Sequence, residues 1–583
     1  MNVADLIVRY LEDIGVERVF FLPGGPVVPL TEAFWKSSKI KLICSNHETG
    51  AAFMAYGYAW SRNTLGVCCV TAGPGTTNAI TGIATARLDR VPLLIISAMN
   101  SIKYFSKKPA QDSSPYDGID TVGIYEKFTC YSKMITSAEE AGYVMQNAIK
   151  IAFLNQGPVH VSLPTDIGFQ EIFPGRQILQ PGQYLPQSPK VPEIKEIQRA
   201  SQALCQAQKP LLFIGHDAVQ SNAFEEIRNL AETLCIPVMT TAKAKGSFPE
   251  KHPLSLGVYG FSSSYQAIQY LKEKHDVLVS LGVEFHENST DLGSELLMPS
   301  KCFIQINSNP LYYGNGYPGD IGLIGNIKEI LSIINQTLPK DSLDPNILES
   351  RKNFIQATKA KVSRFRDPEK LYSASSPIKP QRLLKDIEDS FPEDTVYVVD
   401  AGSSFLWSSH FLTLQKPRTF LISTRHAPMG FSIASIGCKC AFPKTPVVAI
   451  IGDGSMKMQG MEIATAVNNQ LPVVFVVLND SRWGAIHFGY ELLGLKVDLA
   501  KSHSIDFAKL AESLGAIGVT IRKPGEIHKE LIDKLLGLAK PVVLDVYIDP
   551  KECPPFGARI EAMMNHNAKI HSEEVLDCLA SKE

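Results

Sequence analysis

Short runs of apolar residues alternate with longer amphipathic segments along most of the chain. Runs such as GVCCV, LLIISA, LLFIG and VVAIIG are apolar at almost every position, which predicts strands that are buried on both faces. The segment NVADLIVRYLEDIG instead repeats apolar positions at helical spacing and stops at Gly15. Buried strands that alternate with helices predict parallel sheets covered by helices on both faces.

Two proline-rich joints divide this pattern into three blocks. Five prolines fall between residues 173 and 192, and SSPIKP occupies residues 375–380. We expect three successive doubly wound α/β domains with parallel sheets. Their predicted ranges are residues 1–172 (N-terminal), 193–345 (central) and 375–560 (C-terminal), followed by a polar tail over 561–583.

The composition is that of an ordinary globular protein. Of the 583 residues, 45% are hydrophobic and 20% are charged, and the net charge of −2 provides no field that would attract nucleic acid or an anionic membrane. The 11 cysteines form no Cys-x-x-Cys pair, so no zinc ribbon is predicted. The N-terminus is charged throughout, and no apolar run approaches the ~18 residues of a membrane span. We therefore expect a cytoplasmic protein without a nucleic-acid or membrane partner.

The stretch GDGSMKMQGMEIATAVNNQLPVVFVVLND, from Gly452 to Asp480, is the first candidate site. Asp453 and Asp480 each follow an apolar run, and neighbouring parallel strands would bring both to one sheet edge. Carboxylates there suit a hard cation, and Ser455 could cap the next helix and leave N–H groups for an anion. The motif predicts Mg²⁺ bridging a phosphate ester, although Asp-Gly is also a common structural turn.

Two further segments of the N-terminal block carry candidate chemistry. Glu48 stands between the apolar run KLIC and the small-residue segment GAAFMAYGYA, where a carboxylate suits acid–base work. The alternative is an exposed glutamate that merely stabilises a helix start. Residues 73–78, GPGTTN, form either a phosphate nest or a tight strand-to-helix turn.

Taken together, these motifs resemble the fingerprint of thiamine diphosphate enzymes. The segments HETGAAFMAYGYA, TAGPGTTNAITGIATARLDRVPLLIISA, GPVHVSLPTD and FPEKHPLSLGVYG are similar to the acetolactate synthase branch, and the likeness covers nearly the whole chain. It implies that the three domains bind the pyrimidine, a nucleotide-type ligand and the diphosphate, respectively. Thiamine diphosphate and Mg²⁺ are the implied cofactors.

The resemblance also implies roles for single residues. Mg²⁺ would be bound by Asp453, Asp480 and the carbonyl of Arg482, and Glu48 would be catalytic through a hydrogen bond to the pyrimidine. Met429 would bend the cofactor, and the Ala427 carbonyl would accept from its amino group. The implied cofactor-binding set is Gly24, Gly25, Glu48, Gly402, Ser403, Ser404, Ala427, Met429, Gly452, Gly454, Ser455 and Gly484.

The implied reaction is that of a carboligase. It would decarboxylate pyruvate or a similar 2-oxo acid and transfer the acyl unit to a carbonyl acceptor. Asp117, Trp483 and His487 are the candidate substrate contacts. Glu48 and Asp453 of one site would come from different subunits of a homodimer or a dimer of dimers. The alternatives are a non-oxidative 2-oxo acid decarboxylase, a flavin-dependent oxidase and a catalytically silent nucleotide-binding relative.

The chain departs from acetolactate synthases at its substrate and flavin segments. Asp480 stands where asparagine is usual, Cys130 replaces a lysine, Tyr116-Asp117-Gly118 replaces Phe-Gln-Glu, and Gly489 falls near a tryptophan that shapes the acceptor pocket. We therefore expect an acceptor other than pyruvate or 2-oxobutyrate. The central segments LGVEFHENSTD and INSNP lack the arginine and the aspartates of the flavin segments. FAD is predicted to be absent or non-catalytic, with another nucleotide or an empty cleft as alternatives.

Overall fold

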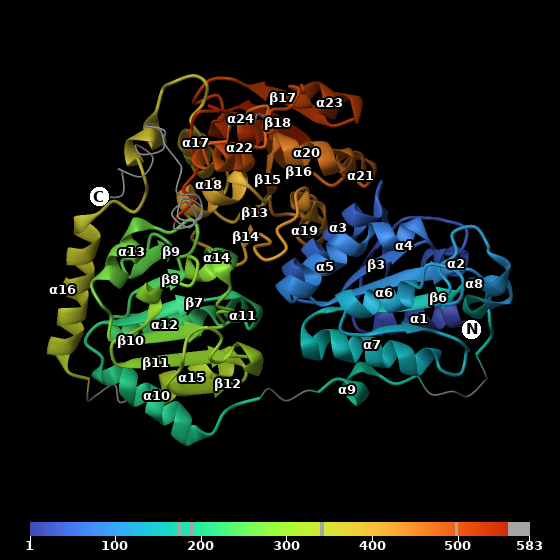
Figure 1. The fold of residues 1–583 in the computed structure, drawn as a ribbon, viewed down its shortest axis with the longest axis horizontal. Coiled ribbons are helices and arrows are strands. Elements are labelled where there is room, and N and C mark those ends of the chain that lie inside the picture. The colour runs from blue at the N-terminus through green and yellow to red at the C-terminus, as the bar shows by residue number, and fades with distance from the viewer. Residues whose placement is uncertain (173–177, 187–189, 339–342, 496–498, 558–583) are drawn as a thin grey trace.

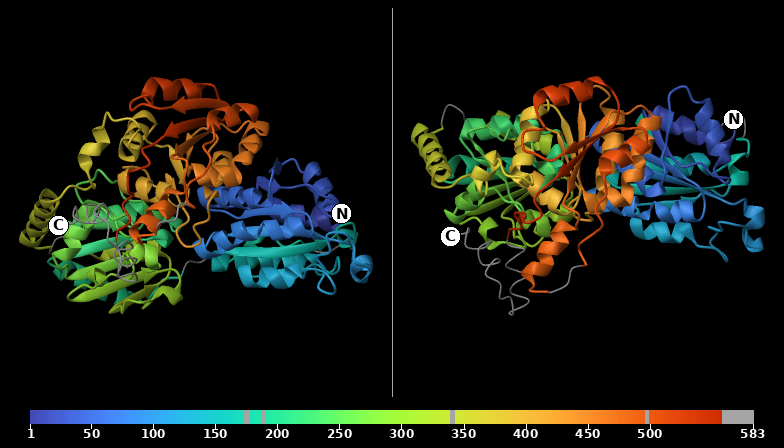
Figure 2. Two further views of the ribbon diagram at one scale, coloured as in Figure 1. Left: turned by 45° about the horizontal axis from the view of Figure 1, so that its top comes forward. Right: turned by 90° about the horizontal axis from the view of Figure 1, so that it is seen from above.

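The computed structural model describes residues 1–172, 178–186, 190–338, 343–495 and 499–557, and these form three α/β domains (Figure 1). Each domain has one six-stranded sheet in which all strand pairs are parallel. Seen from above, the C-terminal domain lies between the other two (Figure 2). The predicted class, three doubly wound parallel-sheet domains, is confirmed. The predicted tail, 561–583, lies outside the described residues.

The N-terminal sheet has the strand order β2-β1-β3-β4-β6-β5. Its strands are β1 (Arg18–Phe21), β2 (Lys41–Cys44), β3 (Gly66–Val70), β4 (Leu93–Met99), β5 (Ser132–Met134) and β6 (Pro158–Pro164). Its helices are α1 (Val3–Asp13), α2 (Val28–Lys36), α3 (Glu48–Arg62), α4 (Pro74–Asn78), α5 (Ile80–Asp89), α6 (Thr121–Phe128), α7 (Ala141–Asn155) and α8 (Thr165–Gly168). Cys68 and Ile95 belong to the core on one face of the sheet, and Cys69 and Ile96 to the core on the other. Burial on both faces explains why the strands read as unbroken apolar runs.

The central sheet has the order β12-β11-β10-β7-β8-β9. Its strands are β7 (Pro210–Ile214), β8 (Val238–Thr240), β9 (Ser255–Val258), β10 (Val277–Leu281), β11 (Cys302–Asn307) and β12 (Ile321–Ile324). Its helices are α10 (Ile194–Gln206), α11 (His216–Gln220), α12 (Phe224–Leu234), α13 (Tyr265–Lys272), α14 (Glu287–Thr290) and α15 (Ile327–Thr337), and α9 (Pro181–Tyr184) and α16 (Pro345–Lys361) lie in the two connections. Counted along the chain, the order is 6-5-4-1-2-3, which is that of dinucleotide-binding sheets.

The C-terminal sheet has the order β14-β13-β15-β16-β18-β17. Its strands are β13 (Val396–Val399), β14 (Phe420–Leu421), β15 (Val447–Gly452), β16 (Val473–Asn479), β17 (Ile517–Ile521) and β18 (Val542–Tyr547). Its helices are α17 (Pro380–Ser390), α18 (Ser403–Phe411), α19 (Ala434–Ala441), α20 (Asp453–Gln459), α21 (Ile463–Asn468), α22 (Gly484–Leu492), α23 (Phe507–Ser513) and α24 (Lys529–Gly537). Counted within each domain, the N-terminal and C-terminal sheets share one order, 2-1-3-4-6-5.

Helices α3 and α19 join the N-terminal and C-terminal domains through one continuous hydrophobic core (Figure 1). A Cβ placed at Gly57 would lie 2.1 Å from the Ala434 carbonyl oxygen, and one at Gly437 would lie 1.9 Å from the Met54 carbonyl oxygen. Glycine at both positions therefore lets the two helix backbones touch. No described helix combines the length and the apolar character needed to cross a bilayer.

Candidate active site

Two aspartates meet at the carboxyl end of the C-terminal sheet. Strands β15 and β16 are neighbours with Gly452 opposite Leu478, and Asp453 and Asp480 follow these strands directly. Asp453 is 2% exposed, and both aspartates line a cavity of about 450 Å³. The two turns therefore meet at one sheet edge, as the strand pattern predicts.

The helix after β15 begins earlier than the motif suggests. Gly452 is the N-cap residue, and α20 starts at Asp453. Ser455 lies inside the first turn, so the expectation that it caps the helix is wrong. Its hydroxyl instead hydrogen-bonds the buried Asp400 carboxylate. Gly-Asp-Gly permits a helix start at any of its residues, which is why the sequence does not fix the cap.

Asp400 fixes the loops around the cavity. Its carboxylate is fully buried and accepts hydrogen bonds from the backbone N–H groups of Ala401 (2.9 Å), Gly430 (3.0 Å) and Ser432 (2.9 Å). Burial raises the pKa of Asp400, and these hydrogen bonds oppose the rise. The carboxylate thereby ties the turn after β13 to the loop that carries Met429.

The turn after β13 presents a hydroxyl that has no partner. Gly402 has φ +80°, a conformation that favours glycine, and it leads into α18 at Ser403. The Ser403 Oγ atom is buried without a hydrogen bond in the structure. A Cβ at Gly484 would lie 3.0 Å from this atom and 3.2 Å from Asp480 Oδ2, so glycine keeps the space open. A buried, unpaired hydroxyl beside a glycine turn fits a ligand such as a phosphate oxygen.

The two carboxylates repel one another in this setting. Burial, and after it the charge of Asp453, raise the pKa of Asp480 to about 7. Lys457 Nζ lies 3.4 Å from Asp453 Oδ2 and opposes the rise that burial causes in the pKa of Asp453. The described residues contain no cluster of three or more His, Cys, Asp or Glu side chains suited to a metal. A divalent cation here fits the carboxylate pair, and its other ligands would be backbone carbonyls, such as that of Arg482, or phosphate oxygens.

The remaining wall of the cavity is largely apolar. The side chains of Trp483 and Met429 pack against Gly454. A Cβ at this glycine would lie 2.3 Å from Trp483 Cδ1 and 3.2 Å from Met429 Cε. A Cβ at Gly489 would meet no atom within 4 Å, so the wall is open there. The other apolar lining residues are Phe261, Phe405, Leu406, Leu478, Ala485, Ile486, Tyr490, Leu493, Ile548 and Phe556.

Glu48 belongs to a separate cluster in the N-terminal domain. It is the first residue of α3 and is 6% exposed, which excludes the alternative of an exposed helix-start glutamate. Asn78 Nδ2 donates a hydrogen bond of 3.0 Å to Glu48 Oε2. A Cβ at Gly75 would lie 3.3 Å from Glu48 Oε1, and one at Gly24 would lie 2.4 Å from Thr71 Oγ1. The turn 73–78 therefore packs against Glu48, and α4 occupies it from Pro74 onward.

The structure gathers most of the predicted site residues at the C-terminal sheet and leaves others apart. Gly24, Gly25 and Glu48 lie in the N-terminal domain, and Asp117 is exposed there. His487 lies on α22, where its Nε2 atom is 3.0 Å from Glu491 Oε1, and it is not among the lining residues. The predicted residues that line the cavity are Gly402, Ser403, Ser404, Ala427, Met429, Gly452, Asp453, Gly454, Ser455, Asp480, Arg482, Trp483 and Gly484.

Some lining residues escaped the sequence reasoning. Phe261 and Asn288 reach the cavity from the central domain, and Phe556 reaches it from the last described segment. Asn288 Nδ2 donates to the Thr424 carbonyl at 2.6 Å, which holds the central domain against the loop after β14. Phe261 and Phe556 stand in no motif, and Asn288 belongs to the segment LGVEFHENSTD, which pointed to the central domain and not to this cavity, so only the arrangement of the domains reveals them.

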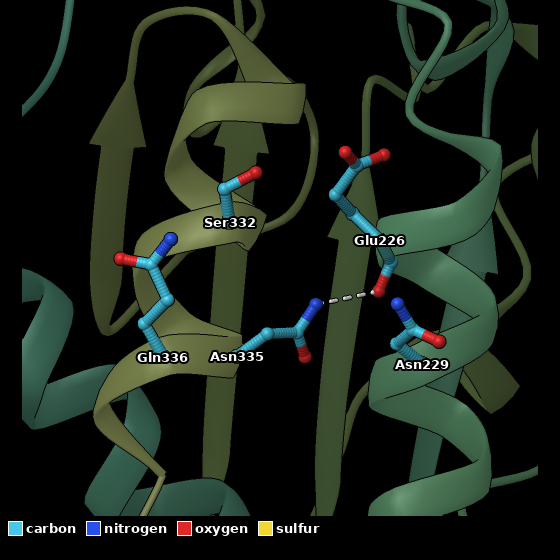
Figure 3. Close-up of a pocket in the computed structure, with 5 residues that line it drawn as sticks. All are labelled: Glu226, Asn229, Ser332, Asn335 and Gln336. Carbon is cyan, nitrogen blue, oxygen red and sulfur yellow. Dashed lines mark hydrogen bonds between the residues drawn. The ribbon is translucent and has the colours of Figure 1, made fainter.

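A second pocket lies between α12 and α15 of the central domain (Figure 3). Its five lining residues, Glu226, Asn229, Ser332, Asn335 and Gln336, are all polar, and Asn335 Nδ2 donates to the Glu226 carbonyl at 2.9 Å. The pocket lies between two helices, away from the strand ends where ligands of parallel sheets bind. It therefore adds nothing to the candidate site.

Comparison with known proteins gives matches along most of the chain. Three family models match the chain: thiamine pyrophosphate enzyme N-terminal TPP-binding domain (residues 1–120), central domain (197–334) and C-terminal TPP-binding domain (400–546). A probable acetolactate synthase large subunit of Methanocaldococcus jannaschii is 32% identical over 95% of this chain and 93% of its own length. The acetolactate synthase isozyme 3 large subunit of Escherichia coli is 29% identical over 94% of this chain and 95% of its own length. The acetolactate synthase large subunit of Corynebacterium glutamicum is 28% identical over 94% of this chain and 87% of its own length.

Proposed function

The chain belongs to the thiamine pyrophosphate enzymes, and on that premise we propose that it is a carboligase of the acetolactate synthase type. It uses thiamine diphosphate and Mg²⁺, decarboxylates pyruvate or a similar 2-oxo acid, and transfers the acyl unit to a carbonyl acceptor. One observation carries this proposal: Asp453, Asp480 and the unpartnered Ser403 hydroxyl converge on a single glycine-lined cavity.

The residues of this cavity would bind and orient the cofactor. The Asp453 and Asp480 carboxylates and the Arg482 carbonyl hold Mg²⁺, while Ser403 and the Gly402 turn face the diphosphate. Met429 and the Ala427 carbonyl position the rings. When bound, the thiamine group supplies the electron sink that decarboxylation of a 2-oxo acid requires.

Glu48 would act as the acid–base group that takes part in proton transfer. Its carboxylate would hydrogen-bond the pyrimidine ring nitrogen of the bound cofactor and could share a proton with it, as a buried acid–base group can. The Asn78 amide, 3.0 Å from Glu48 Oε2, keeps that carboxylate in one orientation. Glycine at position 75 lets the 73–78 turn approach this carboxylate, because a Cβ there would lie 3.3 Å from Glu48 Oε1.

We infer that a complete site needs two copies of the chain. Glu48 does not line the cavity that holds Asp453 and Asp480, so within one chain the two halves of the chemistry are apart. A homodimer, or a dimer of dimers, would bring Glu48 of one copy to the cavity of the other.

The acceptor would be apolar and larger than pyruvate. Gly489 leaves space in a wall formed by apolar side chains such as Tyr490 and Leu493. Tyr116 and Asp117 are exposed, and the segment Tyr116-Asp117-Gly118 contains no cationic side chain that could pair with a carboxylate of the acceptor. Both features favour a ketone or aldehyde with a hydrophobic substituent.

Product identification tests the proposal. Purified protein is incubated with thiamine diphosphate, Mg²⁺ and a panel of 2-oxo acids, with and without aldehyde or ketone acceptors, and products are identified by mass. We expect CO₂ release and a coupled hydroxyketone product. Free aldehyde without any coupled product would instead support a simple decarboxylase and overturn the carboligase assignment.

A further inference from the structure

The central sheet has the strand order of dinucleotide-binding sheets, and this order reverses between β7 and β10. In such sheets, the ligand lies outside the carboxyl ends of the strands at the reversal. The resemblance to acetolactate synthases places FAD in this domain. The residues after β7, β8 and β10 therefore decide whether a nucleotide fits.

Backbone contacts join the turns after β7 and β10, where the strand order reverses. The Gly215 N–H donates to the Leu281 carbonyl at 2.8 Å, and the Asp217 N–H donates to the Gly282 carbonyl at 3.3 Å. A Cβ at Gly215 would lie 2.2 Å from the Gly282 oxygen. The turns after β7 and β10 thus lie directly against each other, and N–H groups that could face a phosphate are already used.

Side chains of the N-terminal domain fill the space above these turns. Lys243, after β8, lies 3.1 Å from Asp89 at the end of α5 and 3.7 Å from Glu284 after β10. Arg90 donates to Asp217 Oδ1 at 2.6 Å. The side chains of Asp89, Lys243, Glu284 and Asp217 are 0–4% exposed. Two ion-pair groups therefore join the N-terminal domain to the central domain at the expected ligand position.

This chemistry does not fit a flavin dinucleotide. Asp217 and Glu284 place carboxylates on both sides of the reversal, where they would repel a pyrophosphate. A cleft that receives a ring system would leave its lining exposed in the ligand-free chain, as the cavity at Asp453 leaves Gly402 and Met429 partly exposed. Both Glu284 oxygens lack a hydrogen bond, and Asp89 Oδ1 and Lys243 Nζ face one another as an ion pair at 3.1 Å, so the charges at this position are compensated by one another.

We propose that interdomain ion pairs have replaced the nucleotide in the central domain, so that the enzyme assembles and works without FAD or an adenine nucleotide. The central domain then serves as a fixed support that holds the N-terminal domain in place. In relatives that bind a nucleotide in this domain, the ligand itself would fill the same space.

Ligand content of the wild-type protein tests the proposal. The full chain is produced with riboflavin supplied in excess and purified without added nucleotide. We expect no flavin absorbance between about 350 and 480 nm, and no stoichiometric FAD, FMN or ADP by mass spectrometry after denaturation. A content near one flavin or nucleotide per chain would overturn the proposal, as would a saturable rise in melting temperature with FAD or ADP. These readouts do not depend on turnover, so they remain decisive if the proposed function fails.

A variant tests the ion pairs themselves. Lys243→Met leaves Asp89 and Glu284 buried without their cation, and we expect the melting temperature to fall by roughly 5–10 °C. Adding Glu284→Gln should restore part of this loss because it removes one uncompensated charge. Lys301→Met is the control, since that lysine is 62% exposed in its pair with Asp276. An unchanged melting temperature for Lys243→Met would refute the supporting role of the ion pairs.

Discussion

The Asn78 side-chain amide donates a hydrogen bond of 3.0 Å to Glu48 Oε2, which fixes a buried carboxylate at the start of α3. The pair joins the two motifs of the N-terminal domain, since Glu48 belongs to HETGAAFMAYGYA and Asn78 ends the turn GPGTTN. Such a fixed carboxylate can exchange a proton with one defined partner only, which is the property that acid–base catalysis needs.

Glu48→Gln should lower kcat by about 10²–10⁴-fold while Mg²⁺-dependent binding of thiamine diphosphate remains. The amide fills the same space but does not take up a proton. Steady-state rates and a binding titration measure the two properties separately. Glu32→Gln is the matched control because Glu32 forms an exposed i,i+4 ion pair with Lys36. A wild-type rate in Glu48→Gln would exclude this residue from the chemistry.

Asn78→Ala should lower kcat more than it raises the KM of the 2-oxo acid, because it frees the Glu48 carboxylate to rotate without removing it. The expected loss is about tenfold, the effect of one lost hydrogen bond to a charged group. Asn78→Gln tests whether the position of the donor matters, because the longer side chain keeps the amide N–H but moves it. Equal rates for all three proteins would show that the hydrogen bond only stabilises the fold.

Gly484→Ala should weaken binding of thiamine diphosphate and Mg²⁺ by about 10–100-fold. Its Cβ would enter the space between Ser403 Oγ, at 3.0 Å, and Asp480 Oδ2, at 3.2 Å. Gly537→Ala, at an exposed helical position with no atom within 4 Å of the new Cβ, is the control. Isothermal titration gives both affinities, and equal values would argue against a diphosphate beside Ser403.

Removal of the metal should abolish most of the stabilisation that thiamine diphosphate confers. At 100 times its Kd, a ligand stabilises the fold by about 2.7 kcal/mol, so the melting temperature should rise measurably with cofactor and Mg²⁺ and return after chelation. Asp453→Asn should reduce this response, because it removes a buried charge from the carboxylate pair. Asp533→Asn, at an exposed position on α24, should respond like the wild type. An undiminished response to cofactor in excess chelator would contradict a metal-bridged diphosphate.

Gly489→Leu should lower kcat/KM for large apolar acceptors by at least about tenfold and change it little for small ones. The added side chain would occupy the open part of the apolar wall, while Asp453 and Ser403 keep their surroundings. The ratio of kcat/KM for a large and a small acceptor is the measurement, with CO₂ release recorded in parallel. An unchanged ratio would place the acceptor elsewhere.

The sequence predicted the strands and the turns that follow them, because strands buried on both faces are visible as apolar runs. It also predicted that Asp453 and Asp480 share one edge, since parallel strands present their carboxyl ends together. It failed at Ser455, where a glycine-rich turn left the start of the helix undetermined. Phe261 and Lys243 have no local signature, and the segment that holds Asn288 did not point to this cavity, because their roles arise from contacts between domains that are distant in sequence. Lys243 in AKAKGS reads like any solvated lysine until Asp89 is seen beside it.

The shared strand order of the N-terminal and C-terminal sheets has a consequence for the origin of the site. Duplication of one ancestral unit would leave two sheets with the same order, 2-1-3-4-6-5, as seen here. In this chain, the N-terminal sheet carries Glu48 in the segment after β2, and the C-terminal sheet carries Asp453 and Asp480 after β15 and β16. Their common ancestor, paired with itself, would already have presented two facing strand edges to a ligand. Under the proposed function, each of the two sheet edges would contribute one half of the cofactor site.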